Sequence, residues 1–179
     1  LMDLHNSAIT GFFQKAVCDR IHATMVLVPK LKQILEGKNY VIASPDAGGV
    51  PRALKFAEKM GQEGIVYFSK ARSAPGEIKQ GSVNISSRVD GQIVVLVDDI
   101  IDSGGTMIED TKAALDAGAS SVIAVAPHAV FSEGALERIE ASPLEMILTT
   151  DSIPRDYAGH STKVSTVSIS ALLARAITN

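Results

Sequence analysis

Short runs of β-branched and other apolar residues alternate along this chain with segments whose apolar residues recur at helical spacing. Val and Ile dominate the short runs, as is typical of buried strands. The regular alternation of strand and helix predicts an α/β fold: a parallel sheet flanked by helices on both faces. The expected strands are residues 40–43, 64–68, 93–97, 121–125 and 146–148, and the expected helices are residues 23–35, 50–60, 107–117, 134–141 and 170–177.

Residues 69–87 interrupt this alternation. The segment is polar and contains Pro75, Gly76 and Gly81, so we expect a long irregular loop of the kind that serves as a lid, a binding loop or a disordered segment. Residues 83–86 alternate in polarity and are expected to form a short strand or a hairpin arm.

Composition narrows the class of protein. A length of 179 residues fits one α/β domain with short extensions, and the net charge of −3 gives no general attraction to nucleic acid or to an anionic membrane. Cys18 is the only cysteine, which favours a reducing, cytoplasmic compartment. No apolar run reaches the roughly 18 residues that span a bilayer. The chain opens with Leu1 rather than Met, and we expect that residues are missing upstream.

Two adjacent carboxylates, Asp98 and Asp99, follow directly after the apolar run 93–97. In open α/β sheets ligands bind at the carboxyl ends of the strands, so these acids are placed where a ligand binds. Adjacent carboxylates repel each other unless something donates to them, and the vicinal hydroxyls of a ribose are suitable donors. We therefore interpret Asp98 and Asp99 as a ribose site.

A glycine-containing turn follows these acids and opens the next helix. Its glycines let backbone N–H groups converge on an anion, the helix N-terminus adds partial positive charge, and the hydroxyl groups add donors. The turn is thus expected to hold the phosphate of the same sugar, the alternative being an ordinary capped strand-to-helix turn. Its residues are Asp102, Ser103, Gly104, Gly105 and Thr106.

A second turn of similar design ends the first expected strand. Asp46, Ala47, Gly48 and Gly49 precede the helix at 50–60, and the two glycines permit close approach of the backbone to a diphosphate. Asp46 could hold a Mg²⁺ ion that bridges phosphate oxygens. Taken alone, the pattern also fits an ordinary β–α turn.

Lys70 and Arg72 begin the irregular segment. Two cations on a segment beside a phosphate site suit stabilisation of a transferring phosphoryl group, although solvated loop charges are the alternative. His5 lies far upstream of the other motifs, and a lone histidine is more often structural than functional.

The segment 94–107, VVLVDDIIDSGGTM, resembles the phosphoribosyl-diphosphate signature of type I phosphoribosyltransferases. The wider chain more narrowly resembles ribose-phosphate diphosphokinase, also called phosphoribosyl diphosphate synthetase, and would cover its C-terminal half without the N-terminal half. On this basis residues 39–179 are expected to form a phosphoribosyltransferase-like domain, and residues 1–38 to continue from a missing upstream domain. Besides the signature, the segments that carry the resemblance are residues 3–5, 11–13, 44–49, 70–72, 128–132, 150–154 and 172–173.

The resemblance implies an activity: transfer of diphosphate from ATP to ribose 5-phosphate, giving phosphoribosyl diphosphate and AMP. It implies a catalytic role for Lys70 with Arg72 as a partner that also binds substrate, and Mg²⁺ bound near the ATP phosphates by His5 and Asp46. Ala71 departs from the family's usual Lys-Arg-Arg pattern. The resemblance also implies a homo-oligomer for the full-length protein. Because this chain would be only a part of that protein, whether it is active in isolation stays open.

Two other readings stay open at this stage. A phosphoribosyltransferase that consumes the same diphosphate would share residues 98–106 but would need a region that recognises a base, and no aromatic-rich candidate stands out. A non-catalytic regulatory homologue would keep the ligand site without turnover.

Overall fold

The computed structural model describes residues 1–74, 77–154 and 161–178, with the side chains of residues 70–82 left out of that description. A seven-stranded sheet forms its centre, in the order β3-β2-β1-β4-β6-β8-β9. All neighbouring pairs are parallel except β2 and β3, which are antiparallel. The strands are β1 (Tyr40–Ser44), β2 (Ile65–Ala74), β3 (Glu77–Ile85), β4 (Ile93–Val97), β6 (Ser121–Val125), β8 (Met146–Thr150) and β9 (Val164–Val167).

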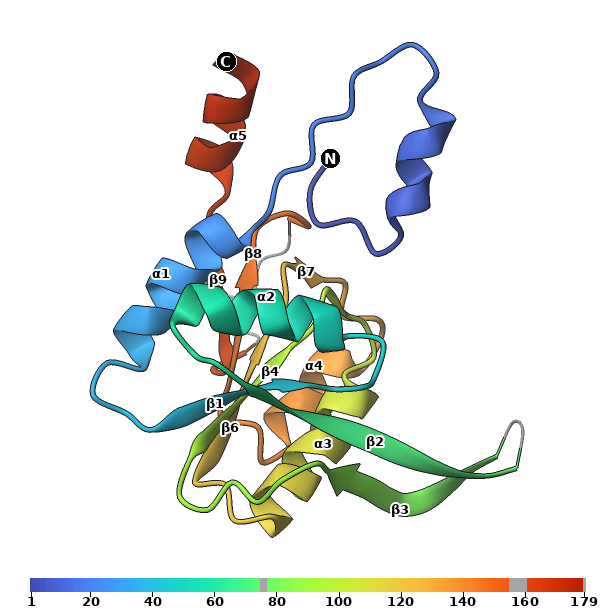
Figure 1. Cartoon of the computed structure of the whole chain (residues 1–179), viewed down its shortest axis with the longest axis vertical. Coiled ribbons are helices and arrows are strands. Elements are labelled where there is room, and N and C mark those ends of the chain that lie inside the picture. Colours follow the sequence, from blue (N-terminus) through green and yellow to red (C-terminus); the bar gives the residue numbers. More distant parts are fainter. Residues whose placement is uncertain (75–76, 155–160, 179) are drawn as a thin grey trace.

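Helices cover both faces of this sheet (Figure 1). On one face α1 packs against α2, and α2 lies over β1, β2 and β4; on the other face α3 contacts β3 and β6. A small second sheet pairs β5 (Ile100–Ile101) with β7 (His128–Ala129). The helices are α1 (Thr24–Ile34), α2 (Val50–Met60), α3 (Gly105–Asp116), α4 (Ala135–Glu140) and α5 (Ser170–Thr178), and a 3₁₀ helix, η1, spans Ser7–Phe12.

The central strand β4 is buried along its whole length and contributes side chains to two hydrophobic cores. Val94 and Leu96 belong to the core shared with α3 and α4, whereas Ile93, Val95 and Val97 belong to the core shared with α1 and α2. Side chains of a strand alternate between the two faces of a sheet, so a run of five apolar residues supplies both cores. The prediction of a mostly parallel sheet between helical layers is confirmed.

The segment 69–87 is not the irregular loop that we predicted. Backbone pairing of Lys70 with Val83 and of Arg72 with Ile78 continues β2 and β3 into a long antiparallel hairpin, which extends away from the rest of the sheet in Figure 1. Register shifts interrupt the pairing around Arg72, so the segment lacks a regular polarity pattern. In this hairpin the two paired backbones satisfy each other's hydrogen-bonding groups, and few apolar side chains mark the strands in the sequence. The sequence therefore predicted only the arm at 83–86.

Strand β9 was also missed. It is short and half-exposed, with only intermediate burial along most of its length, because it forms the edge of the sheet beside β8. Lys163 fixes its start by donating hydrogen bonds to the carbonyls of Ile139, Glu140 and Ser142 at the end of α4. These contacts join positions more than 20 residues apart, which no local pattern reveals.

Helix α1 lies inside the segment 1–38, and its Leu27, Val28 and Leu31 are buried in the core shared with α2. The division of the chain at residue 38 stays a prediction. Among the described residues no helix is both long enough and apolar enough to cross a membrane.

Candidate functional site

The site begins where β4 ends, because the strand delivers Asp98 and Asp99 to the carboxyl edge of the sheet. Arg52, from the first turn of α2, reaches both acids: its Nη1 lies 2.8 Å from Asp98 Oδ1 and its Nη2 lies 2.8 Å from Asp99 Oδ2. The planar guanidinium suits this arrangement because its two terminal nitrogens diverge as a rigid fork. One cation thus offsets the repulsion between two neighbouring carboxylates.

The N-terminal segment supplies a further partner to the same cluster. His5 Nδ1 lies 2.7 Å from Asp99 Oδ2, and the backbone N–H of Asp99 donates to Asp98 Oδ1 over 2.9 Å. The Asp99 side chain is only 8% exposed, whereas that of His5 is 73% exposed. Asp99 is therefore held from two sides, and the remaining face of the His5 ring is open to solvent.

These contacts give the two acids opposite pKa shifts. Burial, together with the neighbouring Asp99, raises the pKa of Asp98 to about 6, against the lowering effects of the Asp99 backbone N–H and of Arg52. Burial also acts to raise the pKa of Asp99, but the hydrogen bond from His5 and the charge of Arg52 outweigh it, and the pKa of Asp99 falls below its ordinary value. As the pH falls, Asp98 is therefore protonated before Asp99. Asp98 gains or loses its proton near pH 6, and Asp99 is still ionised there.

His128 anchors the N-terminal segment that carries His5. Its Nε2 lies 3.2 Å from the carbonyl oxygen of Met2 and 3.1 Å from that of Asp3, and its Nδ1 lies 2.8 Å from Ser152 Oγ. The Asp3 carboxylate in turn accepts a hydrogen bond from the backbone N–H of Ala23 at the start of α1. The position of His5 therefore depends on contacts with β7 and α1 that are distant in sequence.

The glycine turn after Asp99 opens α3, which begins at Gly105. Gly104 is the residue before the helix and has a φ of +75°, a left-handed conformation that favours glycine, and an added Cβ would lie 3.1 Å from Ile139 side-chain atoms. Gly105 has no such restriction, since an added Cβ would meet only Ser103 Oγ at 3.6 Å. Asp102, Ser103 and Thr106 are exposed. Gly104 therefore shapes the turn, and the space outside Gly105 is open.

The other predicted phosphate turn joins β1 to α2. Asp46 Oδ1 accepts a hydrogen bond from the backbone N–H of Gly49 over 2.7 Å, and Ser44 Oγ donates to the carbonyl of Asp46 over 2.7 Å. A Cβ at Gly49 would lie 2.6 Å from Ser44 Oγ, so the close turn requires glycine at this position. Asp46, Ala47 and Gly48 are exposed.

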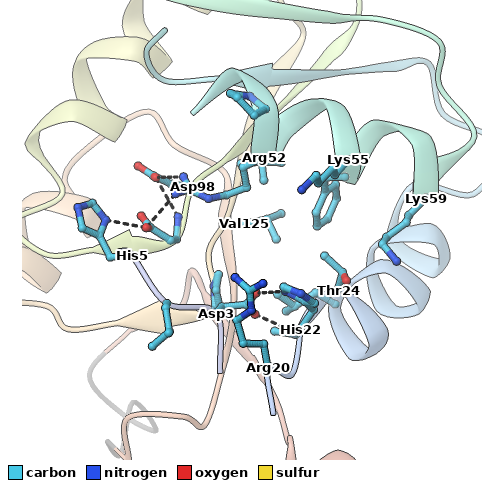
Figure 2. A pocket seen from close by; sticks show the side chains of 18 of the residues that line it. Asp3, His5, Arg20, His22, Thr24, Arg52, Lys55, Lys59, Asp98 and Val125 are labelled. Carbon is cyan, nitrogen blue, oxygen red and sulfur yellow. Dashed lines mark hydrogen bonds and ion pairs between the residues drawn. The ribbon is translucent and has the colours of Figure 1, made fainter. Parts of the chain in front are cut away.

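A cavity of about 490 Å³ adjoins the acid cluster and is lined by the N-terminal segment, α1, α2 and the ends of β4 and β6 (Figure 2). It brings together four of the predicted site residues: His5, Gly48, Asp98 and Asp99. Asp46 and the turn 102–106 are described but do not line it. The backbones of Lys70 and Arg72 lie in β2, and their side chains fall outside the described part of the chain.

Arg52 and His128 were missed as site residues by the sequence reasoning. Arg52 lies three residues after Gly49 in the first turn of α2, and a cation so close to a predicted phosphate turn is a signal that could have been used. In the sequence His128 stands out only as part of the segment 128–132 that carries the family resemblance, and its anchoring role depends on a partner 125 residues away.

Comparison with known proteins places the chain in a family. The phosphoribosyl synthetase-associated domain matches residues 68–179. The chain belongs to the ribose-phosphate pyrophosphokinase family. It is 39% identical over 176 residues to a ribose-phosphate pyrophosphokinase of Chlorobaculum tepidum and 40% identical over 176 residues to that of Helicobacter hepaticus, covering 98% of this chain in each case. It spans only 53% and 55% of those relatives, about half of their length.

Solved structures agree with this membership of the pyrophosphokinase family. The crystal structure of phosphoribosylpyrophosphate synthetase from Mycobacterium smegmatis superimposes with a TM-score of 0.88 and 29% identity, over 99% of this chain and 56% of that chain. A purine phosphoribosyltransferase from Pyrococcus horikoshii, at 17% identity and a TM-score of 0.51 over 82% of this chain and 84% of that chain, shares the fold. The predicted type I phosphoribosyltransferase fold is confirmed.

Arg52→Ala is expected to destabilise this pyrophosphokinase homologue because it leaves two adjacent, partly buried carboxylates without their shared cation. We expect a loss of about 1–3 kcal/mol in the free energy of unfolding at pH 7, measured by urea denaturation. Arg88→Ala serves as a matched control, since the Arg88–Asp90 pair is exposed and such pairs contribute at most about 1 kcal/mol. Equal losses in the two variants would contradict the clamp.

Proposed function

We propose that this chain carries the ribose 5-phosphate site of a ribose-phosphate diphosphokinase, which transfers diphosphate from ATP to ribose 5-phosphate. The observation that carries the proposal is the arrangement at one sheet edge: two acids clamped by Arg52, followed directly by an open glycine turn at the start of a helix. Family membership supports the same reaction, which is that of relatives about twice as long.

The sugar phosphate is bound in two parts. The backbone N–H groups around Gly104 and Gly105, with the hydroxyls of Ser103 and Thr106, receive the 5-phosphate at the positive end of α3. Asp98 and Asp99 accept hydrogen bonds from the ribose hydroxyls, and the exposed Asp102 borders the same turn. Fixing both ends of the sugar orients its O1, which is the main requirement for in-line attack.

In the proposed step, O1 of ribose 5-phosphate attacks the β-phosphorus of ATP. A bond forms between O1 and this phosphorus, the bond to the α,β-bridging oxygen breaks, AMP leaves, and the hydroxyl proton is released. Lys70 and Arg72, carried by β2, stabilise the negative charge of the diphosphoryl group during transfer. The turn of Asp46, Ala47, Gly48 and Gly49 supports the phosphates from the neighbouring strand β1.

His5 and Asp46 would hold Mg²⁺, whose positive charge would offset the negative charge of the triphosphate. His5 donates through Nδ1 to Asp99 and leaves Nε2 open, which is the usual arrangement of a metal-binding histidine. Asp46 uses one oxygen to accept from Gly49 and retains the other. No group of three or more His, Cys, Asp or Glu suitable for a metal occurs among the described residues. This donor set suits an ion that is held mainly by substrate phosphates.

The same proposal includes a homo-oligomer and a cytoplasmic location for the full-length protein.

The direct test of the proposed activity is to incubate the protein with ATP, ribose 5-phosphate and Mg²⁺ and to look for AMP by liquid chromatography. A phosphoribosyltransferase would instead release diphosphate from phosphoribosyl diphosphate when a free base is added. Ribose 5-phosphate binding without formation of AMP would restrict the proposal to a binding half.

Gly105→Val is expected to abolish ribose 5-phosphate binding while the fold is kept. The added side chain fills the space where backbone must approach the phosphate, but meets no protein atom closer than 3.6 Å at its Cβ. Isothermal calorimetry measures the affinity, and circular dichroism checks the fold. Gly64→Val, at another glycine with open space around it, is the control and should bind as the unmodified protein does. Unchanged affinity in folded Gly105→Val would remove the phosphate assignment.

Ribose 5-phosphate affinity is expected to fall as the pH is lowered from 7 to 5. Asp98, with a pKa of about 6 beside Asp99 and Arg52, must be ionised to accept from the sugar, so protons compete with the ligand below this pH. Asp98→Asn should bind more weakly at pH 7 and lose this part of the pH dependence. The dependence that remains in Asp98→Asn reports the phosphate group of the ligand, whose own pKa is about 6. Identical pH profiles for both proteins would contradict the role of Asp98.

Lys70→Ala in the full-length protein should lower turnover far more than it weakens ribose 5-phosphate binding. An ammonium that meets the diphosphoryl group mainly in the transition state contributes to rate rather than to affinity, and loss of such a donor costs about 10²–10³ in rate. Arg72→Ala should act similarly with a larger effect on binding, and the double variant should be less than additive. Steady-state kinetics separates kcat from KM, and no loss in either would make both residues solvated charges.

A further inference from the structure

The glycine turn that opens α3 is supported from behind by α4. Ile139 of α4 is buried, and its side-chain atoms lie 3.1 Å from the position that a Cβ of Gly104 would take. Arg138, the residue before it, donates to the carbonyl oxygen of Ser103 from Nε over 3.3 Å and from Nη2 over 3.1 Å. Two consecutive residues of α4 thus contact two consecutive residues of the turn.

Helix α4 is a firm support because the rest of the fold holds it at both ends. Ala135, in its first turn, is buried in the core shared with α3, as is Ile139 near its end. The ammonium group of Lys163 donates to three carbonyl groups at the C-terminal end of the helix. The backbone that carries Arg138 is therefore fixed relative to α3.

The guanidinium of Arg138 occupies a space that a glycine leaves open. A Cβ at Gly134 would lie 2.8 Å from Arg138 Nη1 and would displace the side chain. Nη2 also donates to the carbonyl of Glu133 over 3.4 Å. Within the described part of the chain Arg138 pairs with no carboxylate, and its partners are carbonyl oxygens, so it keeps a net positive charge.

The hold on the Ser103 carbonyl also fixes the direction of the next backbone N–H. The peptide bond between Ser103 and Gly104 is planar and trans, so its C=O and its N–H point in opposite directions. Because Arg138 binds the oxygen on the side of α4, the N–H of Gly104 is directed away from α4. This N–H donates to no other residue that the structure describes, so it is available to an anion.

We propose that Arg138 is a positioning residue of the sugar-phosphate site, which holds the 103–104 peptide with its N–H free for the 5-phosphate. The inference rests on the proposed function, which assigns this turn to ribose 5-phosphate. Without Arg138 the peptide is free to rotate and to present its carbonyl oxygen to the phosphate, which that oxygen repels. Arg138 acts through Ser103 and lowers the cost of ordering the turn before the ligand arrives.

The experiment compares three variants by calorimetric titration with ribose 5-phosphate. Arg138→Met keeps the aliphatic stem and removes the donors, and we expect binding about 3- to 30-fold weaker, as for the loss of a charged but exposed hydrogen bond. Arg138→Lys keeps the charge without the two-point hold and should recover part of the affinity. Arg175→Met, at an exposed arginine of α5, is the matched control and should bind as the unmodified protein does.

Amide hydrogen exchange in the ligand-free proteins separates positioning from a general loss of structure. Exchange in the turn 102–106 should be faster in Arg138→Met than in Arg175→Met, while the urea midpoint of unfolding stays the same. Weaker binding together with faster exchange confined to this turn supports the positioning role. A lower urea midpoint with faster exchange throughout the chain would make Arg138 a merely structural residue and overturn it.

Two further outcomes separate this inference from the proposed function. If the unmodified protein binds ribose 5-phosphate and Arg138→Met binds it equally well, the sugar-phosphate site stands and the role of Arg138 is refuted. Weaker binding with unchanged exchange in the turn, fully restored by Arg138→Lys, would show an effect of charge alone and would also refute positioning. If no protein of the set binds ribose 5-phosphate, the proposed function fails, and the inference falls with it.

Discussion

Two neighbouring carboxylates at the end of a buried strand, Asp98 and Asp99, repel each other, and the cationic and polar side chains around them offset that repulsion. Arg52 contacts both acids and His5 contacts Asp99, so three separate parts of the chain meet at the end of β4. Each contact is charge-assisted and partly shielded from water, and therefore stronger than the same contact on an open surface. The N-terminal segment, α2 and β4 are connected through this one cluster.

The parallel register of the sheet explains why the cluster lies beside two phosphate turns. Residues 40–43 of β1 pair with residues 93–96 of β4, so the two strands run together and end at the same edge. The turn 44–49 therefore adjoins Asp98 and Asp99, and each turn leads into a helix whose N-terminus points to that edge. Arg52, in the first turn of α2, is delivered to the acids by this same geometry.

The acid cluster lies between a glycine turn and a cavity, and both acids line that cavity. On the side of α3 lies a glycine turn with exposed hydroxyls, and on the side of α1 and α2 lies a cavity lined by Lys55, Lys59 and the apolar side chains of Leu27 and Phe56. Arg52 lines that cavity while it holds both acids.

Local sequence patterns were enough to predict β1, the first part of β2, β4, β6 and β8, the helices on both faces, and the positions of Asp98, Asp99 and the two glycine turns. It could do so because apolar periodicity and glycine-containing turns are local properties of neighbouring residues. The hairpin of β2 and β3, the edge strand β9, the Arg52 clamp and the His128 anchor were decided only by the tertiary structure. In each of these, partners distant in the sequence satisfy backbone groups or charges, and those pairings arise only once the chain has folded.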